Sequence, residues 1–204
     1  MPSATFHNLP PEKQERVLQA AIKEFGLRNV QEANLSNIVK EAGIARGSIY
    51  QYFTSKEDLY VYVFDTLRAH RAEHVQPAFQ LYKKAPFLTF FEAFYLRDSE
   101  YLIQHPAHIA LGQQLYSNAL GVSRGLIQRL QNHYKEIFLI GIDFDKERGE
   151  ISQDIDTSSL ADLCVHFVTD IFIFQSVYSQ LSMRNIHDHC HKTLHIIANG
   201  ILSR

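Results

Sequence analysis

Several side chains that form hydrogen bonds lie close together at Arg46, Ser48, Tyr50, Gln51 and Tyr52. Arg and Gln can contact guanine and adenine edges through two hydrogen bonds at once, whereas Ser and Tyr hydroxyls typically bind phosphate oxygens. Gly47 removes side-chain bulk where the backbone must approach another molecule closely. The stretch therefore indicates a DNA-binding surface, and an ordinary solvated helical hairpin is the alternative.

A second group of reactive side chains lies near the C-terminal end of the sequence. His187, His191 and His195 repeat every four residues and share one helical stripe, and two histidines so spaced can bind zinc. No Glu follows the first of them as in metalloproteases, so we interpret the stripe as interface or solvated histidines and predict no metal site. His105 and His108 are interpreted as core histidines, with ligand contact as the alternative.

Motifs typical of enzymes do not stand out. We find no Gly-rich phosphate loop, no Gly-x-Ser-x-Gly and no compelling catalytic Cys/His or carboxylate arrangement. We therefore predict that the chain is not an enzyme, that it has no catalytic residues and that it needs no cofactor.

The polar stretch is preceded by a helical pattern that would position it. Leu35, Ile38, Val39 and Ala42 fall on one helical face, and Asn34 precedes them as an N-cap. Gly43 follows, where a helix can end through a left-handed turn. We expect a three-residue turn at 43–45 and a second helix from Arg46, whose Ile49 and Phe53 pack back on the first helix. Such a pair is a helix-turn-helix.

Two further helices should complete this part of the chain. Pro10 and Pro11 open the first, which buries Val17, Ala21 and Phe25 and makes a three-helix unit with the helix-turn-helix. The other starts at a capping box, either Thr54 with Glu57 or Ser55 with Asp58, and runs toward Gln76. We expect Pro77 to kink or end it.

Three motifs resemble the DNA-binding signature of the tetracycline-repressor (TetR) family: residues 38–44 (IVKEAGI), 47–53 (GSIYQYF) and 55–59 (SKEDL). The resemblance covers residues 12–60, with Asn34 where the family usually has Thr and Arg46 where Lys is common. It implies a DNA-binding domain at 1–56 and a ligand-binding and dimerisation domain at 57–204, with the fourth helix carrying the ligand signal. The implied DNA-binding residues are Asn34, Ser36, Arg46, Gly47, Ser48, Tyr50, Gln51, Tyr52 and Lys56.

Aromatic residues crowd the helix expected after Pro86, from Phe87 onward. A helix that is apolar nearly all round is buried, and ligand pockets are themselves mostly apolar and aromatic. A plain core and an effector pocket therefore remain equally open. If it is a pocket, we expect the effector to contact Phe64, Phe91, Phe94, Tyr95, Tyr116 and Phe167.

The last two expected helices, 158–180 and 185–202, carry more apolar surface than one face can bury. Large exposed apolar patches are rare on monomers, so we predict a homodimer through residues 158–202. A two-fold dimer would match a pseudo-palindromic operator in double-stranded DNA.

Composition sets broad limits. Residues 1–84 hold 11 basic and 9 acidic residues, or +2, and residues 85–204 hold 9 and 13, or −4, which mildly favours DNA contact at the N-terminal end. Cys164 and Cys190 lie in apolar helical patterns, as expected of buried, reduced thiols. We see no signal peptide and no apolar run long enough to span a membrane, and we expect a cytoplasmic protein.

We predict an all-α fold of about nine helices: an N-terminal three-helix helix-turn-helix unit followed by a larger helical bundle. The implied function is a ligand-responsive transcriptional regulator, a repressor that a small hydrophobic or aromatic effector releases from its operator. The alternative is a non-DNA-binding helical interaction or metal-sensing protein.

Overall fold

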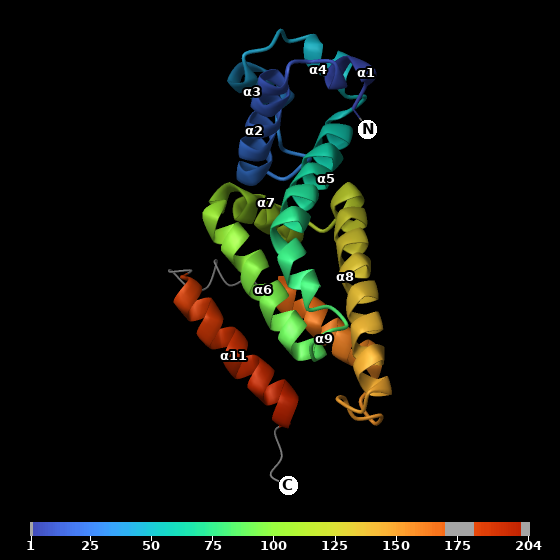
Figure 1. Cartoon of the computed structure of the whole chain (residues 1–204). Coiled ribbons are helices and arrows are strands. Elements are labelled where there is room, and N and C mark those ends of the chain that lie inside the picture. The colour runs from blue at the N-terminus through green and yellow to red at the C-terminus, as the bar shows by residue number, and fades with distance from the viewer. Residues whose placement is uncertain (1, 170–181, 201–204) are drawn as a thin grey trace. The chain divides into compact units, whose positions relative to one another are not determined.

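The computed structural model describes residues 2–169 and 182–200, and every regular element in these ranges is helical, as predicted (Figure 1). In chain order the elements are α1 (Ala4–His7), α2 (Pro11–Leu27), α3 (Leu35–Ala42), α4 (Ser48–Tyr52), α5 (Lys56–Val75), the 3-10 helix η1 (Gln76–Gln80), α6 (Phe87–Gln104), α7 (Pro106–Ser117), α8 (Gly121–Glu147), α9 (Thr157–Thr169) and α11 (Met183–Asn199). None of these described helices is long and apolar enough to cross a membrane.

The chain divides into two compact units. Unit 1 comprises Met1–His70 and His105–Arg129, and unit 2 comprises Arg71–Gln104 and Leu130–Arg204. Both α5 and α8 therefore contribute residues to each unit. The predicted boundary between a DNA-binding and a ligand-binding domain, at residues 56 and 57, does not coincide with a boundary of these units and stays a prediction.

In unit 1, α2 is the helix on which the others pack. It starts at Pro11, with Glu12 in its first turn, and its side chains Val17, Ala21 and Phe25 are fully buried. The helix lies against both α3 and α7. A methyl group added at Gly26 would lie 3.5 Å from the Cβ of Ala110, so α2 and α7 approach closely there.

The start of α5 resolves the choice between two capping boxes. The Asp58 N–H donates to Ser55 Oγ at 3.1 Å, and the Asp58 carboxylate accepts from the Thr54 N–H at 3.1 Å. Ser55 and Asp58 therefore form the cap, with the return bond shifted by one residue. The helix ends at Val75 and Gln76–Gln80 continue as a 3-10 turn, so Pro77 ends the α-helix as predicted.

Unit 2 is organised around α6. The N–H of Phe87, its first residue, donates to the buried carboxylate of Asp145 near the end of α8 at 2.5 Å. A methyl group at Gly141 would lie 2.9 Å from the Phe87 ring, which shows how closely α8 packs against α6. On another side, α11 lies against α6 (Figure 1).

Some predicted helix boundaries are wrong. The charged sequence at 143–157 predicts a surface connection, but α8 continues to Glu147 because the buried Asp145 side chain binds the start of α6. The last helix starts at Met183, where Ser182 caps it, rather than at Asn185. Within the predicted 158–180 helix, α9 accounts for the residues up to Thr169; residues 170–181, together with 201 and 202, lie outside the described residues.

Candidate nucleic-acid interface

The start of α3 is capped as the sequence predicts. Asn34 has an extended backbone, with φ −111° and ψ 114°, and its Oδ1 accepts the Ser36 N–H at 2.8 Å. This bond satisfies one of the free N–H groups at the helix start. The cap therefore sets where α3 begins, and Ser36 lies exposed in its first turn.

A left-handed turn then ends α3 at Gly43, whose φ is 63°. The Ile44 N–H donates to Val39 O at 3.2 Å, as in a helix end closed by a glycine. Our prediction that the second helix begins at Arg46 is wrong: α4 begins at Ser48, because Ala45 O accepts the Ser48 N–H at 2.9 Å and keeps Arg46 and Gly47 in a turn.

The short helix α4 buries one face and exposes the other. Ile49 and, just after the helix, Phe53 are buried in the core of unit 1, as predicted. On the opposite side Gln51 is exposed and Tyr50 is 67% exposed. Arg46 and Gly47 are exposed in the preceding turn, and Ser48 is half-buried. The residues predicted to contact base edges and phosphates, other than Tyr52, are thus at least partly accessible.

Tyr52 is the exception, and its predicted outward position is wrong. Its side chain is only 4% exposed, and its ring centroid lies 5.7 Å from that of Phe6 in α1. The four-residue helix α1 was not predicted, since it is too short to show periodicity. Ser3 caps α1 and also binds the end of α4, donating from its N–H to Tyr52 O at 2.9 Å and from its hydroxyl to Gln51 O at 2.7 Å.

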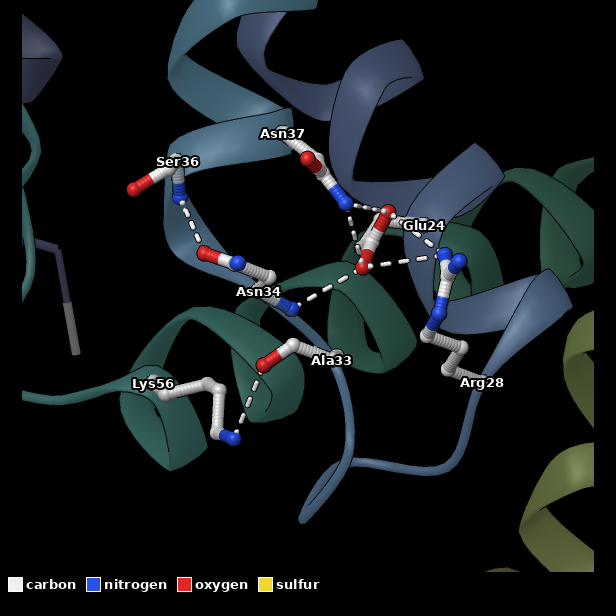
Figure 2. A network of polar contacts seen from close by, with 7 residues as sticks. All are labelled: Glu24, Arg28, Ala33, Asn34, Ser36, Asn37 and Lys56. Atoms are coloured by element: carbon white, nitrogen blue, oxygen red, sulfur yellow. Dashed lines mark hydrogen bonds and ion pairs between the residues drawn. The ribbon is translucent and has the colours of Figure 1, made fainter.

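A buried carboxylate on α2, which the sequence analysis did not single out, holds the start of α3. Glu24 is 5% exposed and accepts the Asn34 N–H at 2.9 Å and the Asn37 side-chain amide at 3.1 Å (Figure 2). Arg28, the residue that follows α2, donates to the same carboxylate at 3.3 Å. Glu at a buried helical position is the sequence signal for such a site, since ionised residues are rarely buried without partners.

Lys56 holds the same turn from the other side. Its ammonium donates to Gln31 O at 2.6 Å and to Ala33 O at 2.9 Å. These carbonyls belong to the turn between α2 and α3, so Lys56 ties the first residue of α5 to that turn (Figure 2). Lys56 was predicted only as a DNA-binding residue, and this structural contact was missed.

Four of the predicted DNA-binding residues surround one recess. The recess has a volume of about 380 Å³, and its walls include Asn34, Ser36, Tyr50 and Lys56 together with Glu32, Ala33 and Leu35. Residues from α3, α4 and α5 thus meet at one surface of unit 1. Arg46, Gly47, Ser48 and Gln51 are not among the residues that surround the recess and lie in α4 or the turn before it.

The residues predicted to bind an effector are divided between the two units. In unit 2, the Tyr95 and Phe167 rings stack with centroids 4.5 Å apart, and Phe91 lies 6.0 Å from Phe167. Phe94 joins the same cluster through Phe138, at 5.9 Å. In unit 1, Phe64 and Tyr116 are partly buried against the core of that unit. The structure therefore brings four of the six together, and their role as a pocket stays a prediction.

The histidine stripe lies on α11, where His187, His191 and His195 are exposed. In the described part of the chain, no group of three or more His, Cys, Asp or Glu side chains is arranged to hold a metal ion. His189, between them in sequence, instead stacks on Phe167 with centroids 5.4 Å apart.

Known proteins resemble this chain in two ways. The family model described as "Bacterial regulatory proteins, tetR family" matches residues 17–63. The uncharacterized HTH-type transcriptional regulator YvdT of Bacillus subtilis is 38% identical over 64 residues, which are 31% of this chain and 33% of that protein. The fatty acid metabolism regulator protein of Bacillus subtilis is 35% identical over 52 residues, 26% of this chain and 27% of that protein. These matches thus span about a third or less of either relative.

The fold is shared over a longer stretch. The crystal structure of the transcriptional regulator FadR from Bacillus subtilis in complex with stearoyl-CoA superposes with a TM-score of 0.76 and 18% identity, covering 92% of this chain and 99% of FadR. The sequence match lies on the helix-turn-helix just described, and the similarity of fold extends to the helices that follow it. Residues 17–63 therefore match the tetR family of bacterial regulatory proteins, and the fold of the whole chain is similar to that of FadR.

Proposed function

We propose that this protein is a ligand-responsive transcriptional repressor, which binds a pseudo-palindromic operator as a dimer and is released by a small hydrophobic effector. The observation that carries the proposal is the two-sided character of α4. Ile49 and Phe53 anchor it in the core of unit 1, while Tyr50 and Gln51 remain exposed beside the exposed turn at Arg46. A helix that is held so firmly and yet presents donors outward suits insertion into a major groove.

The proposed contacts fall into two classes. Arg46 and Gln51 contact base edges and give sequence preference, whereas Ser48, Tyr50 and Lys56 bind phosphates and set the register of the protein on the duplex. Lys56 keeps this role beside its two backbone partners, because an ammonium has three donors and the recess at Lys56 is open to solvent. Asn34 and Ser36, at the start of α3, face the same recess.

A mobility shift with DNA from the protein's own promoter tests this function. The parent protein should shift the promoter fragment at a concentration that leaves a shuffled sequence of equal length free. Raising the salt concentration should weaken both complexes, because phosphate contacts release counterions. A protein that shifts neither fragment at low salt would contradict DNA binding, and would favour a helical interaction protein instead.

The dimer is proposed to form through residues 158–202. Leu163 on α9 and Ile196 on α11 are both about half exposed, at 50% and 53%, which is unusual for large aliphatic side chains. Exposed apolar surface of this kind marks sites of association. A two-fold dimer places its two recognition helices in successive major grooves, about 34–36 Å apart or multiples of this spacing.

The effector is proposed to bind among the aromatic side chains of unit 2. The ring centroid of Phe167 lies 4.5 Å from that of Tyr95 and 6.0 Å from that of Phe91. FadR, which shares the fold, was crystallised with stearoyl-CoA, and this supports an effector with a long apolar part. Such a ligand releases the operator only if it binds more tightly to the conformation that fits DNA poorly.

Thermal shift measurements with stearoyl-CoA, stearate and coenzyme A alone test the effector class. We expect the molecules with an apolar tail to raise the melting temperature and coenzyme A alone to leave it unchanged. Operator DNA must then weaken the binding of the effector by the same factor as the effector weakens DNA binding, typically about 5- to 150-fold. Equal effector affinities with and without operator would contradict the allosteric part of the proposal.

A further inference from the structure

Glu24 is unusual among the inward-facing residues of α2. Its neighbours on that face include Val17, Ala21 and Phe25, which are fully buried and apolar, whereas Glu24 is a buried residue with a carboxyl group. A buried carboxylate is costly to remove from water unless its oxygens accept hydrogen bonds from several donors. The hydrogen-bond donors around Glu24 therefore indicate the structural role of this residue.

Three residues donate to Glu24, and two of them belong to the start of α3. Its Oε1 accepts the backbone N–H of Asn34 at 2.9 Å, and the Asn37 side-chain amide donates to both oxygens at 3.1 and 3.2 Å. The third donor is Arg28, just beyond the end of α2. Figure 2 shows the carboxylate between these groups, with Asn34 and Asn37 on one side and Arg28 on the other.

Asn34 is consequently held at both of its ends. Its backbone N–H binds Glu24 on α2, while its side-chain oxygen caps the Ser36 N–H of α3. The Glu24 carboxylate thus links the first turn of α3 to α2. Lys56 adds a second restraint on the same turn by binding Gln31 O and Ala33 O.

From this geometry we infer that Glu24 is a positioning residue for operator recognition, acting through Asn34 and Asn37. The inference rests on the proposed function, because it concerns how α3 is placed against DNA. Glu24 itself is buried and touches no base or phosphate in this scheme. It places Asn34 and Ser36 at the recess and, through the turn at Gly43, α4 beside them.

Substitutions at residue 24 separate this role from general stabilisation. Leucine fills the site but leaves the Asn34 N–H without its acceptor, so the start of α3 loses its hydrogen bonds to α2. Glutamine retains an acceptor oxygen for Asn34 and can bind Asn37 after that amide turns over, so it rescues the geometry without the charge. Positioning thus predicts a large effect for leucine and a small one for glutamine.

The test compares operator DNA with shuffled DNA of equal length by fluorescence anisotropy, at a temperature where each variant is folded by circular dichroism. For Glu24→Leu we expect operator affinity to fall at least about tenfold, as when a base contact is misplaced, while affinity for shuffled DNA changes less than about threefold. Glu24→Gln should stay within about threefold of the parent on both DNAs. Hydrogen exchange at the Asn34 amide should accelerate in the leucine variant and not in the glutamine variant.

Leu67→Ala is the matched control for lost stability. Leu67 is buried in the same unit but lies eleven residues beyond Lys56, or about 16 Å along α5. Once folded, this variant should bind both DNAs as the parent does.

The possible outcomes are distinct. A Glu24→Leu variant whose ratio of operator to shuffled affinity equals that of the parent overturns the inference and leaves the proposed function standing. A parent protein that binds both DNAs equally overturns the proposed function, and the inference with it. If Glu24→Leu does not fold, Glu24→Asp replaces it: the shortened carboxylate keeps its charge but not its reach to Asn34, so a parental affinity ratio in that variant also overturns the inference.

Discussion

Arg71 and Asp98 form a buried, two-bonded ion pair in unit 2. Arg71 Nε lies 2.9 Å from Asp98 Oδ1 and Arg71 Nη2 lies 2.5 Å from Oδ2, with 12% and 3% of the two side chains exposed. The pair joins the C-terminal part of α5 to the middle of α6 within unit 2. Because α5 begins at the candidate DNA-binding surface, this ion pair fixes the far end of the helix that, by the resemblance to the TetR family, is expected to carry the ligand signal.

Breaking the pair on one side should be costly. Asp98→Ala removes the carboxylate that pairs with the buried Arg71 charge, and we expect the free energy of unfolding in urea to fall by about 3–5 kcal/mol. The double variant Arg71→Met with Asp98→Leu should recover most of this loss, because apolar side chains of similar size remove the desolvation cost of both charges. An Asp98→Ala protein with the parental urea midpoint would contradict the importance of the pair.

Gly43 and Gly47, the two glycines in the turn between α3 and α4, should respond differently to alanine. Gly43 has φ +63°, so Gly43→Ala should lower the free energy of unfolding by about 1–2 kcal/mol through backbone strain alone. Gly47 has φ −75°, and no described atom lies within 4 Å of an added methyl group there. Gly47→Ala is therefore the control and should leave thermal stability unchanged. Equal melting temperatures for the two variants would show that the left-handed turn carries no such cost.

The local features of this fold were accessible from the sequence because short-range rules determine them. The cap at Asn34, the left-handed turn at Gly43 and the burial of Ile49 and Phe53 depend on spacing within a few residues. The exposed position of Tyr50 and Gln51 follows from the same helical period.

What the sequence did not show depends on residues far apart in the chain. Tyr52 is buried because Phe6 covers it, and α8 extends past residue 143 because Asp145 caps α6. The links from Glu24 to Asn34 and from Lys56 to Ala33 likewise need the folded arrangement of two helices. Helical periodicity predicts which face of a helix is buried but does not predict its partner across the core.

The two cysteines should be unreactive while the protein is folded. Burial raises the pKa of the Cys164 thiol to about 12, and burial together with the Glu92 charge raises the pKa of Cys190 to about 12. Since the thiolate is the nucleophile, both thiols stay protonated at neutral pH. We expect the folded protein to release no colour from a chromogenic disulfide reagent at pH 8. After denaturation, two thiols per chain should react with the reagent. Rapid labelling of either cysteine at pH 8 in the folded protein would contradict this assignment.

Ile196→Asp tests the proposed dimer surface on α11. Ile196 is exposed in the single chain, so the substitution should cost the monomer little stability, while in a dimer it would bury an unpaired charge. Analytical ultracentrifugation at micromolar concentration should find the parent dimeric and the variant largely monomeric. Leu27→Asp, at a 65% exposed position of α2 outside residues 158–202, should remain dimeric. If Ile196→Asp sediments as the parent does, the interface lies elsewhere.

The central claim is that the turn before α4 and α4 itself recognise a DNA sequence, and Arg46→Ala tests it most directly. The measurement is the affinity of parent and variant for the promoter operator and for shuffled DNA of equal length, at one fixed salt concentration. Arg124→Ala, which removes the same charge from an exposed position of α8, serves as the control. Losing one base contact of two hydrogen bonds costs about 1–3 kcal/mol, so Arg46→Ala should weaken operator binding about 5- to 150-fold and shuffled binding far less. If Arg46→Ala lowers the affinity for operator and for shuffled DNA by the same factor, sequence recognition by this surface is contradicted. A parent protein that binds both DNAs with equal affinity would also contradict it.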